Sequence, residues 1–197
     1  MDVKKKILLL VIALFVALTC LTACNSYAST LQDLQSLLKV RYSEVVLSTT
    51  TTTSDITLKG IYTMTFESDK TTVDYSFDRL NGLSLDGNNA DRYKDTIQGC
   101  AVVQNGSVIE GDTSVELPQE LDFSGISFKQ AFFKNYTISN TKFDADVAYP
   151  AGFTGGNVEC SDMHVTVLYS HTALKKIEIT YTSNNGADVK ITYLFTK

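Results

Sequence analysis

The chain has 197 residues, of which 44% are apolar, and it carries 22 acidic against 17 basic side chains, a net charge of −5. This apolar content excludes an intrinsically disordered chain, and the negative charge, with no basic stripe anywhere, makes nucleic acid a poor partner. The plentiful Thr, Tyr, Val, Ile and Phe residues, with only two prolines, favour half-buried strands.

The N-terminal segment has the layout of a bacterial export signal. Three lysines at positions 4–6 precede an uncharged apolar run over residues 7–23. The run ends in Leu-Thr-Ala-Cys at residues 21–24, which resembles the lipobox, where small residues fit the signal peptidase and a thiol receives the lipid. We therefore expect cleavage before Cys24 and a diacylglycerol thioether with further acyl chains, such as palmitate, on that cysteine. Cys20 follows a threonine and is the poorer acceptor.

Lipidation would hold the protein on the extracytoplasmic face of the cell membrane, where two or three acyl chains give stable attachment. An uncleaved transmembrane anchor is the alternative, because an apolar run of about 17 residues reaches the lower limit for a spanning helix. Cleavage leaves 174 residues with 14 basic and 21 acidic side chains, a net charge of −7. Because this charge disfavours lying flat on anionic lipid, we expect attachment through Cys24. A tether over residues 24–29 and a single domain over residues 30–197 would follow.

The domain begins with a helix and continues in strands. Thr30 can cap a helix that ends near residue 40, and Leu31, Leu34 and Leu38 fall on one face of it. The apolar pattern then changes to period two, which is typical of strands. We expect strands over residues 42–50, 56–67 and 73–77, a turn at residues 68–70, and an edge strand or loop at the threonine tract of residues 49–53.

The middle of the chain is less regular, and its last third alternates clearly between apolar and polar residues. From Met163 to Phe195 the alternation predicts a three-stranded antiparallel meander. We expect irregular chain over residues 81–95, 111–125 and 150–157, a hairpin of residues 97–104 and 107–110 about Asn105-Gly106, a short helix over residues 127–133, and one strand or a strand pair over residues 136–147.

The order of these elements resembles the LolA/LolB lipoprotein-carrier superfamily. The likeness is carried by the helix at residues 30–40, the strand pair at residues 56–78 and the closing meander at residues 163–195. It implies a mainly β (α+β) fold, in which a curved antiparallel sheet forms a half-barrel with an N-terminal helix and few short helices covering its concave face. It also implies an apolar cavity that holds acyl chains. The arginine-based gating of that family has no match among the three arginines here, Arg41, Arg79 and Arg92.

Aromatic and methionine side chains gather on the apolar phases of the strands, where adaptable groups suit apolar ligands of variable shape. Their alternative role is to form the core under the helices. The residues expected to line a ligand cavity are Tyr62, Met64, Phe66, Tyr75, Phe77, Met163, Tyr181 and Tyr193.

Two cysteines, Cys100 and Cys160, would remain after cleavage and lipidation. In an exported domain they form either a disulfide or two reduced thiols. A metal site is not expected, because no CxxC spacing occurs and the chain has only two histidines, His164 and His171.

No catalytic constellation stands out, so we expect no enzyme activity and no cofactor. His164 lies on the polar phase of a strand and His171 in a turn, positions typical of solvated side chains. The acidic stretch at residues 86–91 lacks the glycine and glutamate positions of a calcium loop.

Three functional hypotheses remain. The first is a membrane-anchored module that binds a lipid, a lipopeptide or another apolar ligand, because the apolar sheet face exceeds what so few helices can cover. The second is a non-catalytic surface interaction or structural β domain without a ligand cavity, and the third is a hydrolase with dispersed residues around His164. A protein partner is not identified by the residues.

Overall fold

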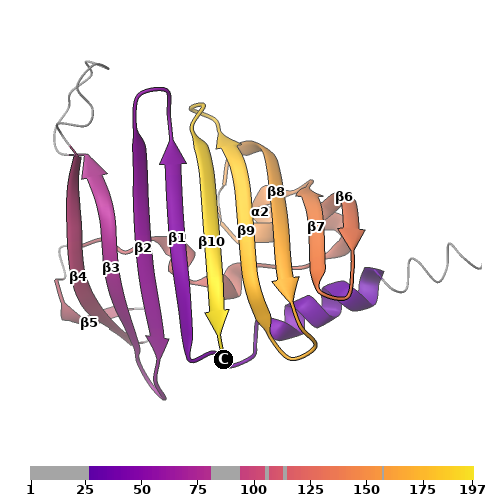
Figure 1. Ribbon diagram of the computed structural model, residues 1–197, viewed down its shortest axis with the longest axis horizontal. Coiled ribbons are helices and arrows are strands. Elements are labelled where there is room, and N and C mark those ends of the chain that lie inside the picture. The colour runs from indigo at the N-terminus through magenta and orange to yellow at the C-terminus, as the bar shows by residue number, and fades with distance from the viewer. Residues whose placement is uncertain (1–26, 81–93, 105–106, 113–114, 157) are drawn as a thin grey trace, which may run out of the picture.

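The computed structural model describes residues 27–80, 94–104, 107–112, 115–156 and 158–197. In this part of the chain, ten strands form one antiparallel sheet, and the helical segments lie on one side of it (Figure 1). The strands are β1 (Glu44–Thr52), β2 (Thr57–Phe66), β3 (Thr71–Leu80), β4 (Lys94–Gln104), β5 (Ser107–Gly111), β6 (Phe133–Ile138), β7 (Lys142–Val147), β8 (Cys160–Tyr169), β9 (Leu174–Ser183) and β10 (Asp188–Thr196).

The sheet is built from two meanders that meet at its centre. Its order is β5-β4-β3-β2-β1-β10-β9-β8-β7-β6, so β1 to β5 run outward to one edge and β6 to β10 return from the other. At the centre, the first strand in sequence, β1, pairs with the last, β10, and Leu47 of β1 lies opposite Tyr193 of β10. This register places the apolar phases of both meanders on the same face.

Few helical segments cover that inner face. The N-terminal helix occupies residues 27–37, and α2 (Pro150–Thr154) lies behind β8 and β9 (Figure 1). Three single-turn 3-10 segments, η2 (Gln119–Leu121), η3 (Phe123–Gly125) and η4 (Gln130–Phe132), interrupt an otherwise irregular run between β5 and β6. The two halves of the sheet are therefore covered differently.

The half formed by β6 to β10 is covered by a dense core. Leu31 and Leu34 of the N-terminal helix, and Leu38 directly after it, are buried, which confirms the expected apolar face. They meet Phe143 of β7 and Phe153 of α2, which are both fully buried. Removing side chains of this size from water stabilises the fold by roughly 1.5–3 kcal/mol each.

The predicted mainly β class, its antiparallel pairing and the closing meander are confirmed. The threonine tract belongs to β1, a central strand rather than an edge or a loop. Residues 136–147 form part of a strand pair that breaks near Asn140, as expected. The Asn105-Gly106 turn and most of the irregular stretch at 81–95 lie outside the described residues.

Three boundaries differ from the sequence prediction. Residues 27–29 are already helical, so the helix expected to begin at Thr30 includes them, because Tyr27 packs into the core at 2% exposure. Residues 150–154 form α2 instead of a loop, since Pro150 occupies a favourable first position and Gly155 ends the helix at φ 72°. The helix expected over 127–133 is reduced to the single turn of η4.

The sheet is open and does not curl into the expected half-barrel. Its edge strands are β5 and β6, which lie at opposite ends of the sheet (Figure 1). Curling of a sheet needs bulges or kinks at its bends, and the register shifts here lie in the outer pairs β4–β5, β6–β7 and β8–β9. The central pairs run without a shift, so the middle of the sheet twists without folding over.

Candidate functional site

Residues 115–125, which we call the covering segment, lie over the inner face of β2 to β5 and include η2 and η3. The hydroxyl of Tyr193 donates a 2.9 Å hydrogen bond to the backbone oxygen of Glu120. Phe123 packs edge-on against Phe66 of β2 and Phe195 of β10, with ring centroids 6.2 and 5.4 Å away. These contacts fix the segment across the centre of the sheet, while its two sides stay loosely packed.

A first cavity of about 760 Å³ lies between the covering segment and strands β2 to β5. This volume is within the range of cavities that hold small apolar ligands. Its lining is mostly aliphatic on both sides, with few polar groups. The lining residues are Met64, Phe66, Thr71, Val73, Val103 and Val108 from the strands, and Val115, Glu116, Leu117, Pro118, Gln119, Leu121 and Asp122 from the covering segment.

A second cavity of about 470 Å³ lies on the other side of the covering segment, over β9 and β10. Gln119 and Asp122 line both cavities, so the two are neighbours separated by η2. The second cavity combines the acidic groups of Glu120, Asp122 and Glu159 with the rings of Tyr181 and Tyr193.

Glu120 dominates the electrostatics around the second cavity. Burial raises the pKa values of the Tyr62, Tyr181 and Tyr193 hydroxyls, and the negative charge of Glu120 is the next cause in all three. Asp122 raises the pKa of Tyr193 further. Burial is thus the main cause of all three raised pKa values, and the Glu120 charge adds to it.

The eight residues expected to line a single cavity are divided by the structure. Met64 and Phe66 line the first cavity, and Tyr181 and Tyr193 line the second. The remaining four line neither cavity. Tyr62, Tyr75 and Phe77 pack on one another with ring centroids about 6 Å apart, and Met163 is buried at 2% exposure in the core.

The covering segment is the part of the site that the sequence prediction missed. It was expected to be irregular, which is correct, but no function was attached to it. Its apolar residues Val115, Leu117 and Leu121, set around Pro118, were the available signal, because an exposed loop has no need of them.

Cys100 and Cys160 are both free thiols, so the expected alternative of a disulfide is wrong within this chain. They lie on β4 and β8, with five strands between them. Six strand spacings of ~4.8 Å put them roughly 29 Å apart, whereas a disulfide needs Cα atoms within about 7 Å.

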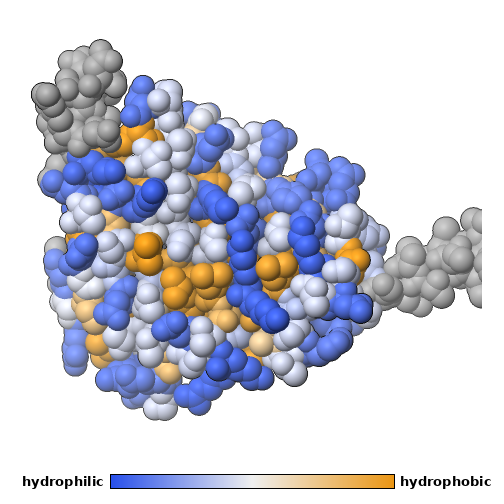
Figure 2. All heavy atoms as spheres, viewed as in Figure 1, coloured by the Kyte–Doolittle hydropathy of each residue, from blue (hydrophilic) through white to orange (hydrophobic). Residues whose placement is uncertain are grey.

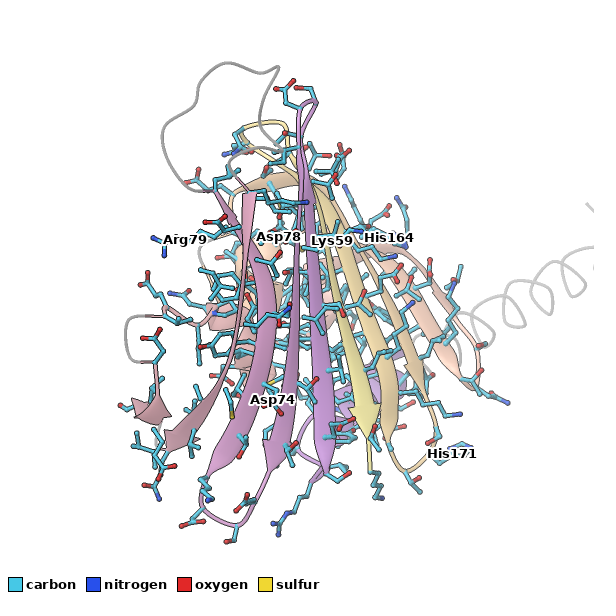
Figure 3. All side chains as sticks on the ribbon, turned by 60° about the vertical axis from the view of Figure 1, so that its left-hand side comes forward. Lys59, Asp74, Asp78, Arg79, His164 and His171 are labelled. Carbon is cyan, nitrogen blue, oxygen red and sulfur yellow. The ribbon has the colours of Figure 1, made fainter. Side chains whose placement is uncertain are left out.

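His164 lies on the outer face of the sheet (Figure 3), on the polar phase of β8 as expected. Its Nε2 lies 3.1 Å from Asp144 and its Nδ1 lies 3.0 Å from Asp146. Hydrogen bonds from Lys142 first, and then from Thr166, lower the pKa of Asp144. No nucleophile is found in these contacts, and they offer no argument for a hydrolase.

Among the described residues, no group of three or more His, Cys, Asp or Glu side chains is placed to hold a metal ion. Within the same part of the chain, no helix has the length and hydrophobicity needed to cross a membrane. Cys24 and the apolar run before it lie outside the described residues.

Comparisons with known proteins place this chain in no family. No family model matches it, and no curated protein does. One solved structure among the matches, a crystal structure of an N-terminal dehydratase from the difficidin assembly line, is 12% identical and covers 86% of this chain and 84% of its own. Its TM-score of 0.15 is too low to carry an argument about fold or function.

Proposed function

We propose that the protein is a membrane-anchored extracytoplasmic lipoprotein that binds a lipid or another apolar ligand in the first cavity. The observation that carries this proposal is the unequal covering of the sheet. The N-terminal helix and α2 belong to the dense core under β6 to β9, and the second cavity over β9 and β10 is the smaller one, at about 470 Å³. Only the covering segment lies over β2 to β5, where it leaves about 760 Å³ between mostly aliphatic walls.

The size and chemistry of the first cavity support an apolar ligand. Val73, Val103 and Val108 form its floor, and Leu117 and Leu121 form its roof. Each methylene of a ligand that leaves water for such walls gains about 0.8 kcal/mol. An acyl or similar chain therefore suits this cavity better than a polar metabolite does.

Lipidation at Cys24 is the proposed means of attachment. Tyr27 is packed into the core and stacks on Tyr136 of β6, with ring centroids 3.7 Å apart. Three residues of chain span at most about 11 Å, so a lipid on Cys24 would hold the β6 edge of the sheet close to the bilayer. The first cavity lies toward the other edge, at β5, and stays accessible.

The ligand proposal is tested with the chain from residue 25 onward, since the described core begins at Tyr27. Val108 lines the cavity from edge strand β5, and its neighbour Ile109 is 49% exposed on the opposite face. We expect Val108→Phe to fill part of the cavity and weaken the binding of a neutral naphthylamine fluorophore about tenfold, whereas Ile109→Phe has no effect. Failure of the wild-type chain to bind the fluorophore, together with no lipid in its organic extract, contradicts the proposal.

The anchor is tested separately with the full chain in a bacterial host. We expect metabolic labelling with a palmitate analogue to mark the wild-type chain and the Cys20→Ala variant. Cys24→Ala should abolish the label, and a label that persists in this variant would contradict lipidation at Cys24. A membrane-bound wild-type chain whose mass still includes residues 1–23 would favour an uncleaved transmembrane anchor instead.

A second candidate is an interaction domain that uses the outer face. Ile61 and Leu194 are 52% and 46% exposed there, and Val46 lies between their strands, opposite Leu194. Figure 2 shows hydrophobic side chains gathered at the centre of this otherwise polar face. Sedimentation of the wild-type chain and Ile61→Lys would show whether the patch mediates self-association.

A further inference from the structure

The linings of the two cavities contain charges of only one sign. Four carboxylates line them in the described part of the chain, and no Lys, Arg or His residue does. They are Glu116, Glu120, Asp122 and Glu159. An anionic ligand would approach the cavities against all four charges.

Glu120 is the carboxylate best placed to meet a ligand. Glu159 accepts a 3.0 Å hydrogen bond from Asn184, and Asp122 accepts one of 3.0 Å from the backbone N–H of Ser124. Glu120 is partly buried, and among the ion pairs that join described residues none involves it. Its carboxylate therefore remains available for a cation from outside the chain.

The surroundings of Glu120 suit a positively charged group. Tyr181 and Tyr193 line the same cavity, and a cation above an aromatic ring is attracted by its negative face. A charged donor to a carboxylate also makes a stronger hydrogen bond than a neutral one. The hydrogen bond from Tyr193 to the Glu120 backbone oxygen fixes the main chain of this residue at the cavity.

We propose that the ligand is a cationic amphiphile, whose apolar chain fills the first cavity while its amine or ammonium group lies in the second cavity against Glu120. This inference rests on the proposed function, because it needs an apolar ligand in the first cavity. Gln119 and Asp122 line both cavities and are exposed, so the ligand would cross from one cavity to the other over these two side chains at the surface. Anionic amphiphiles of the same chain length bind more weakly because the carboxylates repel them, and neutral ones bind through the chain alone.

The test compares three probes with one twelve-carbon chain: dodecylammonium, dodecanol and laurate. Each probe is titrated at low salt, and below the concentration at which that probe forms micelles, against the chain from residue 25 onward with the neutral fluorophore bound. Displacement of the fluorophore gives the affinity of the probe. We expect dodecylammonium to bind at least about tenfold more tightly than laurate, with dodecanol between them. Added salt should reduce the difference.

Two variants assign the effect to Glu120. Glu120→Gln should weaken dodecylammonium binding about tenfold and leave dodecanol binding unchanged. Glu44→Gln, on the outer face of β1, changes one charge without touching either cavity and should leave all three affinities unchanged. Thermal unfolding of both variants checks that the fold is intact.

Equal or tighter binding of laurate, or a Glu120→Gln variant that loses dodecanol and dodecylammonium alike, overturns the inference. Both outcomes leave the apolar ligand itself standing. Failure of all three probes and of the fluorophore instead contradicts the proposed function, so the two failures are distinguishable.

Discussion

The hydroxyl of Tyr193 lies 2.9 Å from the backbone oxygen of Glu120, and this contact joins the central strand β10 to the covering segment 73 residues away in sequence. Tyr193 is 3% exposed, so the carbonyl it satisfies has little access to water on that side. One half-buried hydrogen bond therefore holds the partition between the two cavities.

We expect Tyr193→Phe to lower the free energy of unfolding by about 1 kcal/mol, because a half-buried acceptor loses its donor while the ring stays in place. Denaturant unfolding measures this change. Tyr181→Phe is the matched control, because Tyr181 lines the same cavity but makes no comparable backbone contact among the described residues. If Tyr181→Phe lowers the free energy of unfolding as much as Tyr193→Phe does, the hydrogen bond of Tyr193 makes no specific contribution to stability.

Gly99 of β4 is required by the ring of Tyr75, its cross-strand neighbour on β3. A Cβ atom at Gly99 would lie 2.5 Å from the Tyr75 hydroxyl oxygen and 2.7 Å from the ring carbon that bears it. We expect Gly99→Ala to destabilise the protein by about 1–3 kcal/mol through this overlap. At Gly156 a Cβ has no neighbour closer than 4.0 Å, and Gly156→Ala should change the unfolding midpoint little. A neutral Gly99→Ala would mean that the Tyr75 ring is free to move away.

The carboxylate of Asp78 lies beside the Lys59 backbone on the outer face (Figure 3). A hydrogen bond from the Lys59 N–H, foremost, and others from Thr96 and Lys94 lower its pKa. The pKa of Asp78 is therefore lower in the folded protein than in the unfolded chain, where an aspartate has a pKa of about 3.9. This difference stabilises the folded protein above about pH 3.9, and the stabilisation is lost as the pH falls through the pKa of the folded state.

We therefore expect wild-type stability to fall below about pH 4, and Asp78→Asn to show a shallower fall there. Thr96→Val removes one of the three partners and should give an intermediate slope. The measurement is the urea midpoint as a function of pH. A variant profile parallel to that of the wild type would contradict the role of Asp78.

Cys100 lies opposite Asp74 on the outer face, and Figure 3 shows Asp74 low on β3. Burial first, and then the hydrogen bond and negative charge of Asp74, raise the pKa of this thiol. A raised pKa means less thiolate at a given pH and slower alkylation. We expect Asp74→Asn to speed the labelling of Cys100 near pH 8, while the rate at Cys160 stays unchanged. Mass spectrometry after timed alkylation gives both rates.

The same measurement after mild oxidation should still find Cys100 and Cys160 alkylated, because the two thiols of one chain are too far apart to form a disulfide.

The amino-acid pattern by itself determined the strands, the apolar face of the N-terminal helix and the antiparallel meander at the end of the chain. These are local properties, since a period of two or of 3.6 residues decides which side chains share a face. The same pattern placed Met64, Phe66, Tyr181 and Tyr193 on the inner face, where each lines a cavity.

Only the tertiary structure decided which inner-face residues belong to the core and which to a cavity. Met163 and Met64 have the same character in sequence, but one lies under the N-terminal helix side of the sheet and the other under the covering segment. That difference depends on which distant segment packs above each strand. The sheet order, which puts five strands between Cys100 and Cys160, and the hydrogen bond between Tyr193 and the Glu120 backbone are likewise long-range consequences of packing, and no local period encodes them.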